Sequence, residues 1–169
     1  MIDTPGFTTA RLVLRPREMT DLEACVAMDR DPEVTRFVAG PWRDPLVHRA
    51  FVAERINFAF PPGMGYWSIL SADGFLGWIL LAPLDLRGPE IEIGWRLVRR
   101  GWGLGYATEA ARPVLAHALG ALELPLVVAD IDPDNRASVK VVRKLGLRYL
   151  GPIAYHGRMV ERYIARRSE

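Results

Sequence analysis

The 169-residue sequence contains a single cysteine, Cys25. One cysteine excludes an internal disulfide and leaves no cysteine cluster that could hold a metal, a composition typical of a reducing cytosol. The N-terminal residues include no continuous apolar run of the length of a secretory signal. Residues 76–86 are apolar but too few to cross a membrane, and Pro83 interrupts them. We therefore expect a cytoplasmic protein with no membrane segment and no bound metal.

Lysine is also scarce, because Lys140 and Lys144 are the two lysines among 22 basic residues. The 20 acidic residues leave a net charge of +2, and no basic run is interleaved with aromatic residues, so nucleic acid is not an expected partner. Hydrophobic residues make up 50% of the chain and charged residues 25%, which is enough apolar material for a buried core. Residues 1–169 are accordingly predicted to form one domain.

Residue patterns and turn signals predict an α/β chain. Strands are predicted at 11–17, 65–71, 75–84, 90–98, 126–130, 148–153 and 159–166. Helices are predicted at 20–29, opened by a capping box at residues 20–23, and from Pro45 to residue 60, after the N-cap residue Asp44. Two more are predicted at 103–119 and, after a turn at 132–135, up to residue 145. Cys25 lies on the first helix, where core packing is its expected role.

The most informative stretch runs from Arg99 to Ala111, where glycines at 101, 103 and 105 lead into a predicted helix. Glycine lets successive backbone N–H groups turn toward a common centre, and a helix N-terminus adds roughly half a positive charge there. The stretch indicates an anion site suited to phosphate, with a simple turn as the alternative. A P-loop is excluded because the lysine is missing, and a dinucleotide motif because its last glycine would fall on Tyr106 or Thr108.

The spacing Arg100-x-x-Gly103-x-Gly105 resembles the pyrophosphate-binding signature of the GNAT acyl-CoA N-acyltransferases. Residues 102–110, Trp-Gly-Leu-Gly-Tyr-Ala-Thr-Glu-Ala, are similar to the branch that contains the ribosomal-protein alanine N-acetyltransferases, the RimJ/RimL-like enzymes. This resemblance implies a GNAT fold, which is a single mixed and mostly antiparallel sheet, splayed between its fourth and fifth strands and flanked by about four helices. It also implies acetyl-CoA as the co-substrate.

The same resemblance implies which residues hold the cofactor. Leu97 and Val98 would offer backbone groups to pantetheine, while Arg99 and Arg100 would add positive charge or, alternatively, form a solvated strand end. The pyrophosphate would lie on the amides of Gly101, Trp102, Gly103, Leu104, Gly105 and Tyr106.

A second motif, Asp132-Pro-Asp-Asn-Arg-Ala-Ser138, supports the first. By resemblance, Asn135 would hydrogen-bond the pantetheine arm and Ser138 would lie near the thiol. Both residue types are also favoured at helix starts, so capping is the alternative role.

Acyl transfer to an amine needs a group that accepts the amine proton. Glu92, on the strand that enters the glycine stretch, is the expected base, acting through water. The alternative is a carboxylate that faces solvent or pairs with an arginine, and Glu90 is the reserve candidate. Ser138 is the expected partner of the sulfur, because Val142 stands where many family members have a tyrosine that protonates the leaving thiolate.

The acceptor is expected to be a primary amine, either a protein N-terminal α-amine or a small molecule, attacked directly in a ternary complex. Residues that could line its pocket, with ordinary packing as the alternative for each, are Phe37, Trp42, Trp67, Tyr155 and His156. A homodimer is common in the family, and these residues neither require nor exclude one. The rival functions are a non-catalytic acyl-CoA-binding or sensing module and a nucleotide-binding regulator.

Overall fold

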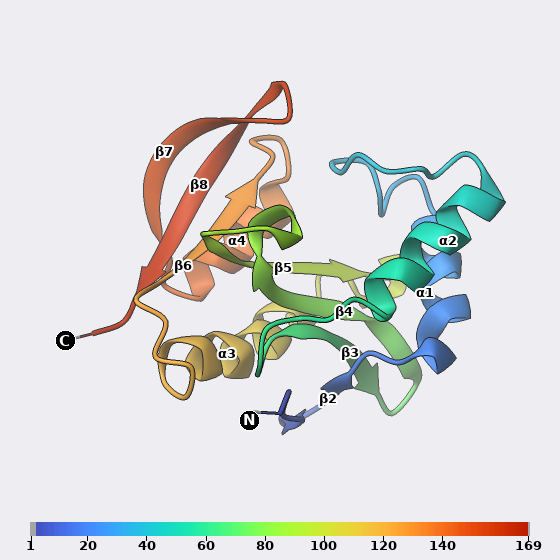
Figure 1. Cartoon of the computed structure of the whole chain (residues 1–169), viewed down its shortest axis with the longest axis horizontal. Coiled ribbons are helices and arrows are strands. Elements are labelled where there is room, and N and C mark those ends of the chain that lie inside the picture. The colour runs from blue at the N-terminus through green and yellow to red at the C-terminus, as the bar shows by residue number, and fades with distance from the viewer. Residues whose placement is uncertain (1–2, 169) are drawn as a thin grey trace.

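The computed structural model describes residues 3–168. Its strands form one eight-stranded sheet in the order β1-β2-β3-β4-β5-β6-β8-β7 (Figure 1). The strands are β1 (Phe7–Thr8), β2 (Val13–Pro16), β3 (Gly65–Ser71), β4 (Gly74–Pro83), β5 (Ile91–Leu97), β6 (Leu126–Ile131), β7 (Arg148–Tyr155) and β8 (Arg158–Arg166). The helices are α1 (Leu22–Asp29), α2 (Pro45–Ile56), α3 (Tyr106–Leu119) and α4 (Arg136–Lys144), with short 3₁₀ turns η1 (Met19–Asp21), η2 (Leu84–Leu86) and η3 (Arg99–Gly101).

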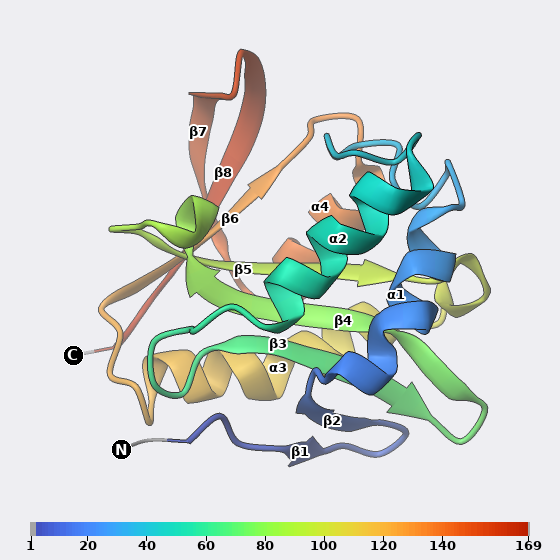
Figure 2. The same cartoon turned by 45° about the vertical axis from the view of Figure 1, so that its right-hand side comes forward.

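The sheet splays open between β5 and β6. These are the fourth and fifth strands expected from the sequence, since β1 was not expected, so the position of the splay agrees with the family resemblance. These two neighbours run parallel, and their register consists of a single pair, Glu92 opposite Val128. Figure 2 shows β6 diverging from β5 beyond this point, while β3, β4 and β5 form an antiparallel meander. The C-terminal half of β5 therefore lacks a neighbouring strand on its β6 side among residues 3–168.

The two faces of the sheet carry different helices. Helix α3 packs on one face through small buried side chains one turn apart, such as Ala110, Val114 and Ala118. On the other face, α1 and α2 pack together around a smaller cluster that includes Cys25 and Val52 (Figure 2). Cys25 is 1% exposed, which confirms its predicted packing role. The face under α1 and α2 holds the site described below.

Several element boundaries differ from the sequence expectation. The predicted capping box at residues 20–23 is wrong, because Glu18 and Asp21 form the reciprocal capping pair and α1 begins at Leu22. Helix α2 starts at Pro45 with the Asp44 cap as predicted, but it ends at Ile56. Helix α3 starts at Tyr106 instead of residue 103, and the two-residue strand β1 was not expected.

Candidate active site

A cavity of about 600 Å³ lies between the open face of the sheet, helices α1 and α2, and the turn between β7 and β8. Alternation along the strands supplies its floor, with Tyr66 from β3, Trp78 and Leu80 from β4, and Glu92 and Arg96 from β5. Its other walls include Arg17, Cys25, Asp29, Trp42, Phe51, Arg55, Asp85, Tyr155, His156 and Arg158. Aromatic rings and charged groups thus share one enclosure.

Glu92 is the carboxylate that β5 directs into this cavity. Its neighbours Ile93 and Trp95 pack on the α3 face, so the two-residue period of the strand places Glu92 on the opposite side. Burial raises the pKa of Glu92 to about 7, repulsion by Asp130 and Asp85 adds to the rise, and Arg162 opposes it. Near neutral pH both protonation states are populated, which is what a general base requires.

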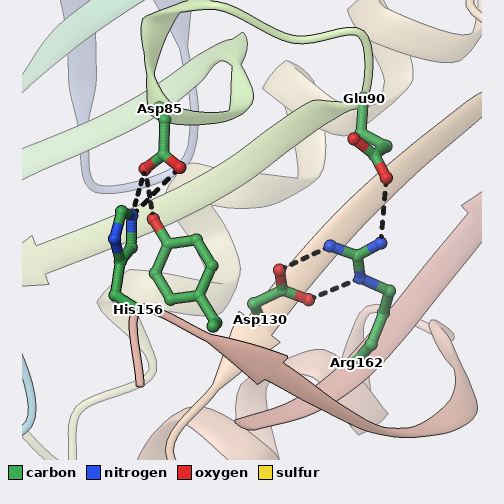
Figure 3. Close-up of polar contacts among 6 residues, drawn as sticks. Asp85, Glu90, Asp130, His156 and Arg162 are labelled. Atoms are coloured by element: carbon green, nitrogen blue, oxygen red, sulfur yellow. Dashed lines mark hydrogen bonds and ion pairs between the residues drawn. The ribbon is translucent and has the colours of Figure 1, made fainter. Parts of the chain in front are cut away.

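Asp85 lines the same cavity as Glu92. Figure 3 shows the side chain of His156 pointing toward Asp85. The Tyr155 hydroxyl donates to Asp85, and His156 Nε2 lies 3.1 and 3.0 Å from its two oxygens. Burial acts against ionisation of Asp85, but these hydrogen bonds outweigh it and lower its pKa. The pKa of Tyr155 is raised, first by burial and then by its bond to Asp85, so this hydroxyl stays protonated.

Arg162 forms the second ionic cluster in Figure 3. Its guanidinium contacts both oxygens of Asp130 at 2.8 Å and Glu90 Oε1 at 3.2 Å. Glu90, the reserve candidate for the base, is therefore paired with an arginine and does not line the cavity that Glu92 lines. Because Arg162 holds Asp130 in place, it also fixes one of the charges that raise the pKa of Glu92.

The glycine stretch turns left-handed before α3, with φ of 72° at Gly103 and 81° at Gly105. A side chain is strained in this conformation, which gives a physical reason for glycine at both positions. Among residues 3–168 the amides of 103–106 have no backbone acceptor. The amides of Gly101 and Trp102, by contrast, already donate to Val98 and Arg99. Of the six amides predicted to bind the anion, the four nearest the helix, at 103–106, therefore have no backbone acceptor among residues 3–168 and can donate to a ligand.

The arginines around this stretch do not lie as expected. Arg99 forms a two-pronged ion pair with Asp31, and Arg100 Nη2 donates to the Phe75 carbonyl at 2.6 Å, so both guanidinium groups have partners within the chain. Arg11, which the sequence did not single out, lies at the stretch instead. Its Nη2 donates to the Leu104 carbonyl at 2.9 Å.

The backbone of Leu97 and Val98 is partly committed. The Val98 amide donates to Leu76 at 2.8 Å, and the Leu97 carbonyl accepts from Trp102 Nε1 at 2.9 Å. The Val98 amide is thus not free for a ligand, which corrects part of the expectation. Each carbonyl retains a second lone pair that can still accept.

Asn135 and Ser138 meet at the start of α4. The Ser138 amide donates to Asn135 Oδ1 at 3.2 Å, so the capping alternative is realised. Ser138 Oγ lies 3.3 Å from Trp95 Nε1 on β5, so the serine faces the open side of the splay. Because the indole can only donate, the serine hydroxyl accepts this bond and keeps its own proton for another partner. Val142, where a tyrosine was missing, is fully buried.

Three of the five aromatic residues expected at the acceptor pocket line the cavity, namely Trp42, Tyr155 and His156. Trp67 does not, because β3 turns its side chain to the α3 face, where it is 0% exposed and its Nε1 donates to the Pro5 carbonyl. Phe37 does not line the cavity either, although its carbonyl accepts from Arg158 at 2.9 Å. Because neighbouring residues of a strand face opposite sides of the sheet, Tyr66 lines the cavity while Trp67 packs in the core.

The sequence reading missed a buried ionic group under α1. Arg96 Nη1 donates to Asp29 Oδ1 at 2.8 Å, and His48 Nε2 lies 3.2 Å from Asp29 Oδ2. The Arg96 guanidinium lies about 5 Å from the Trp42 and Trp78 ring centres, at 5.1 and 5.0 Å. Arg96 could have been found by extending the period from Glu92 along its strand. Asp29 and His48 carried no such signal, because only packing of α1 on α2 joins them.

Comparisons with known proteins agree with this geometry. The family described as the Acetyltransferase (GNAT) domain matches residues 11–148. The FsC-acetyl coenzyme A-N(2)-transacetylase of Aspergillus fumigatus is 31% identical over 155 residues, which are 86% of this chain and 66% of that relative, slightly under two thirds of its length. The uncharacterized protein YkkB of Bacillus subtilis is 40% identical over 151 residues, 85% of each chain. The crystal structure of an acetyltransferase from Agrobacterium tumefaciens is 29% identical with a TM-score of 0.77, covering 98% of this chain and 96% of that one.

Residues 3–168 contain no group of three or more metal-ligating side chains. None of the helices in that range has the length and hydropathy needed to cross a bilayer.

Proposed function

The chain belongs to the acetyltransferase (GNAT) family and is an acetyl-CoA-dependent N-acetyltransferase, and we propose that its amine acceptor binds in the 600 Å³ cavity with Glu92 as the general base. The observation that carries this proposal is the position of Glu92 at the start of the splay, with a pKa raised to about 7. A carboxylate with this pKa can accept a proton from an amine near neutral pH without being permanently ionised.

The cofactor is proposed to lie along the opening between β5 and β6. The amides of Gly103, Leu104, Gly105 and Tyr106 would hold the pyrophosphate, because they have no backbone acceptor in the described part of the chain and stand at the positive end of the 14-residue helix α3. Contacts from residues 97–102 would come from carbonyls and side chains. Asn135 would donate its amide NH₂ to pantetheine, since its oxygen already caps α4.

In the proposed reaction, the amine nitrogen attacks the thioester carbonyl directly in a ternary complex, the N–C bond forms and the C–S bond breaks. The amine proton passes to Glu92 through water, and Ser138 donates its hydroxyl hydrogen toward the leaving sulfur. A thiolate needs little acid assistance, because the pKa of a thiol is about 8.5. Holding the two reactants together supplies roughly 7 to 11 kcal/mol of the required acceleration.

An α-amine suits this weak base better than a lysine side chain. Near pH 7.5 the α-amine is about one-third neutral, whereas lysine is neutral about once in a thousand, a difference of roughly 3 kcal/mol. We propose an acceptor of this type, on a protein N-terminus or a small molecule. The string at residues 102–110 favours the RimJ/RimL-like branch. We also propose that residues 1–169 act as one cytoplasmic domain, and a homodimer is compatible with this proposal.

The first test is ligand binding followed by turnover. Thermal unfolding is measured with acetyl-CoA, CoA, NAD or ATP, each at about 100 times the dissociation constant, where a specific ligand adds roughly 2.7 kcal/mol of stability. We expect stabilisation by acetyl-CoA and CoA only. Release of CoA is then followed with a panel of small amines and peptides. Binding of CoA without acetylation of any amine would instead support the non-catalytic module.

A further inference from the structure

Arg17 stands at the end of β2 with its guanidinium buried under the cavity. Its Nε and Nη2 atoms are inaccessible to solvent and have no hydrogen-bond partner within residues 3–168. Its guanidinium carbon lies 3.6 Å from the centre of the Tyr66 ring, and its amide donates to the Tyr66 carbonyl. By contrast, Arg15 and Arg162 each form two-pronged contacts with a carboxylate.

A buried guanidinium without an acceptor carries a desolvation cost. Burial accordingly lowers the pKa of Arg17, although an arginine remains charged. The nearby Cys25 thiol does not neutralise it, because burial raises the pKa of that thiol to about 11. Asp29, a carboxylate that lines the same cavity, already contacts Arg96 and His48. Within residues 3–168, the Arg17 guanidinium therefore stacks on the Tyr66 ring but forms no ion pair with a carboxylate.

The two ends of the cavity carry opposite charges. Near Arg17, the Arg55 guanidinium carbon lies 3.6 Å from the centre of the Phe51 ring, and Arg55 has no ion-pair partner among residues 3–168, so it is a second cation at this end. The other end carries Glu92 and the ionised Asp85. An acceptor with an amine at one end and an anion at the other would complement both.

Strand register gives the distance between these ends. Tyr66, whose ring carries the Arg17 guanidinium, is paired with Leu80, and Leu80 is paired with Gly94, two residues from Glu92. Neighbouring strands lie about 4.8 Å apart, so the β3 backbone at Tyr66 is roughly 10 Å from the backbone of β5, which bears Glu92. The floor between them is aromatic, with Tyr66 and Trp78 in edge contact at 5.0 Å.

We propose that Arg17 binds a carboxylate of the acceptor, and that this acceptor is a primary amine carrying its carboxylate roughly 10 Å from the reacting nitrogen. This inference rests on the proposed acetyl transfer at Glu92. A free α-amino acid is too short to span the two groups. An extended tripeptide fits, because a chain spans at most about 3.3 to 3.6 Å per residue. A polyamine, which has cations at both ends, is rejected by Arg17.

The test uses glycine peptides of one to four residues, each as the free acid and as the C-terminal amide. A charge-assisted contact predicts that kcat/KM for triglycine exceeds that for triglycinamide by about 10- to 100-fold, with a smaller ratio for the shorter peptides. Arg17→Met should bring the ratio to within about twofold of one. The matched control is Arg30→Met, which removes an exposed arginine outside the cavity and should leave the ratio unchanged.

Because the acid-to-amide ratio is measured on one protein sample, a partly unfolded variant does not distort it. Arg17→Lys, which keeps the charge, should retain an intermediate preference. A ratio near one in the wild-type enzyme, with acetylation of neutral amines intact, would overturn the inference and leave the proposed function standing.

A second measurement needs no turnover. Calorimetry on the CoA complex compares N-acetyl-triglycine with its C-terminal amide, and the acid should bind at least tenfold more tightly in wild type and equally in Arg17→Met. Selective binding without acetylation of any amine would support the anion site and refute the proposed function. Equal binding of acid and amide by wild type would refute the anion site.

Discussion

Replacing Glu92 with glutamine should stabilise the protein at alkaline pH. Burial and the charges of Asp130 and Asp85 raise the pKa of Glu92 from the ordinary 4.5 to about 7. Since each unit of pKa difference corresponds to about 1.4 kcal/mol, ionised Glu92 costs the native state roughly 3 kcal/mol. The native state binds the Glu92 proton more tightly than the unfolded chain does. The contribution of Glu92 to the free energy of unfolding therefore falls as pH rises from about 4.5 to about 7 and is then constant.

Urea unfolding of wild type and Glu92→Gln at a series of pH values measures this cost. The variant should gain stability relative to wild type as pH rises, by up to about 3 kcal/mol at pH 8. Glu90→Gln is the matched control, because this carboxylate is 40% exposed and paired with Arg162. The reasoning is refuted if Glu92→Gln shows no relative gain between pH 4.5 and pH 8.

The same variant should lose activity where it gains stability. Loss of a general base lowers kcat/KM by at least about 100-fold at pH 8. Wild-type Glu92 is roughly 3% ionised at pH 5.5, so the ratio of wild type to variant should fall about 30-fold between pH 8 and pH 5.5. The acceptor for this profile is an aromatic amine that stays unprotonated throughout, so that the protein alone titrates. A pH-independent ratio would exclude Glu92 as the base.

Further predictions concern the cofactor stretch, the electrostatics around Glu92 and the core. Gly103→Asp should abolish detectable CoA binding by calorimetry, because it adds strain at φ 72° and a negative charge at the proposed anion site. The control Gly146→Asp, at φ 80° with similarly open surroundings, should bind CoA as wild type does. Equal binding by both variants would place the pyrophosphate elsewhere. Asp85→Asn should lower the pKa of Glu92 and move the pH–rate profile to lower pH. The shift should be smaller than the effect of burial, because repulsion by Asp85 is a smaller cause of the raised pKa. A shift to higher pH would show that Asp85 does not raise the pKa of Glu92. Cys25 should react with a thiol reagent only as fast as the protein opens, since it is 1% exposed and burial raises its pKa to about 11; rapid labelling of the folded protein would contradict its place in the core.

The local elements were readable from the sequence because they depend on neighbours in the chain. The Asp44–Pro45 start of α2 and the left-handed glycines before α3 follow from backbone stereochemistry alone. Gly103, Gly105 and the following helix start indicated an anion site from backbone chemistry alone, whereas the cofactor was implied by their resemblance to the GNAT signature.

The placement of Glu92 in the cavity could be expected from strand period, but its pKa could not. That value depends on Asp130, from β6, and on Asp85, from η2, which only the tertiary structure brings near. Trp67 and Tyr66 differ by a single position in β3, and the choice of which one faces the core is made by packing of the whole sheet.

By itself, the sequence determined the α/β pattern of elements, the glycine stretch that resembles the GNAT signature and the position of Glu92 on its strand, because each depends on residues close together in the chain. Only the tertiary structure decided which charges are neutralised. Asp29 is satisfied by Arg96 and His48, Glu90 by Arg162, and the buried atoms of Arg17 by no group in residues 3–168. Ion pairing depends on distances between remote segments, and no local pattern records those distances.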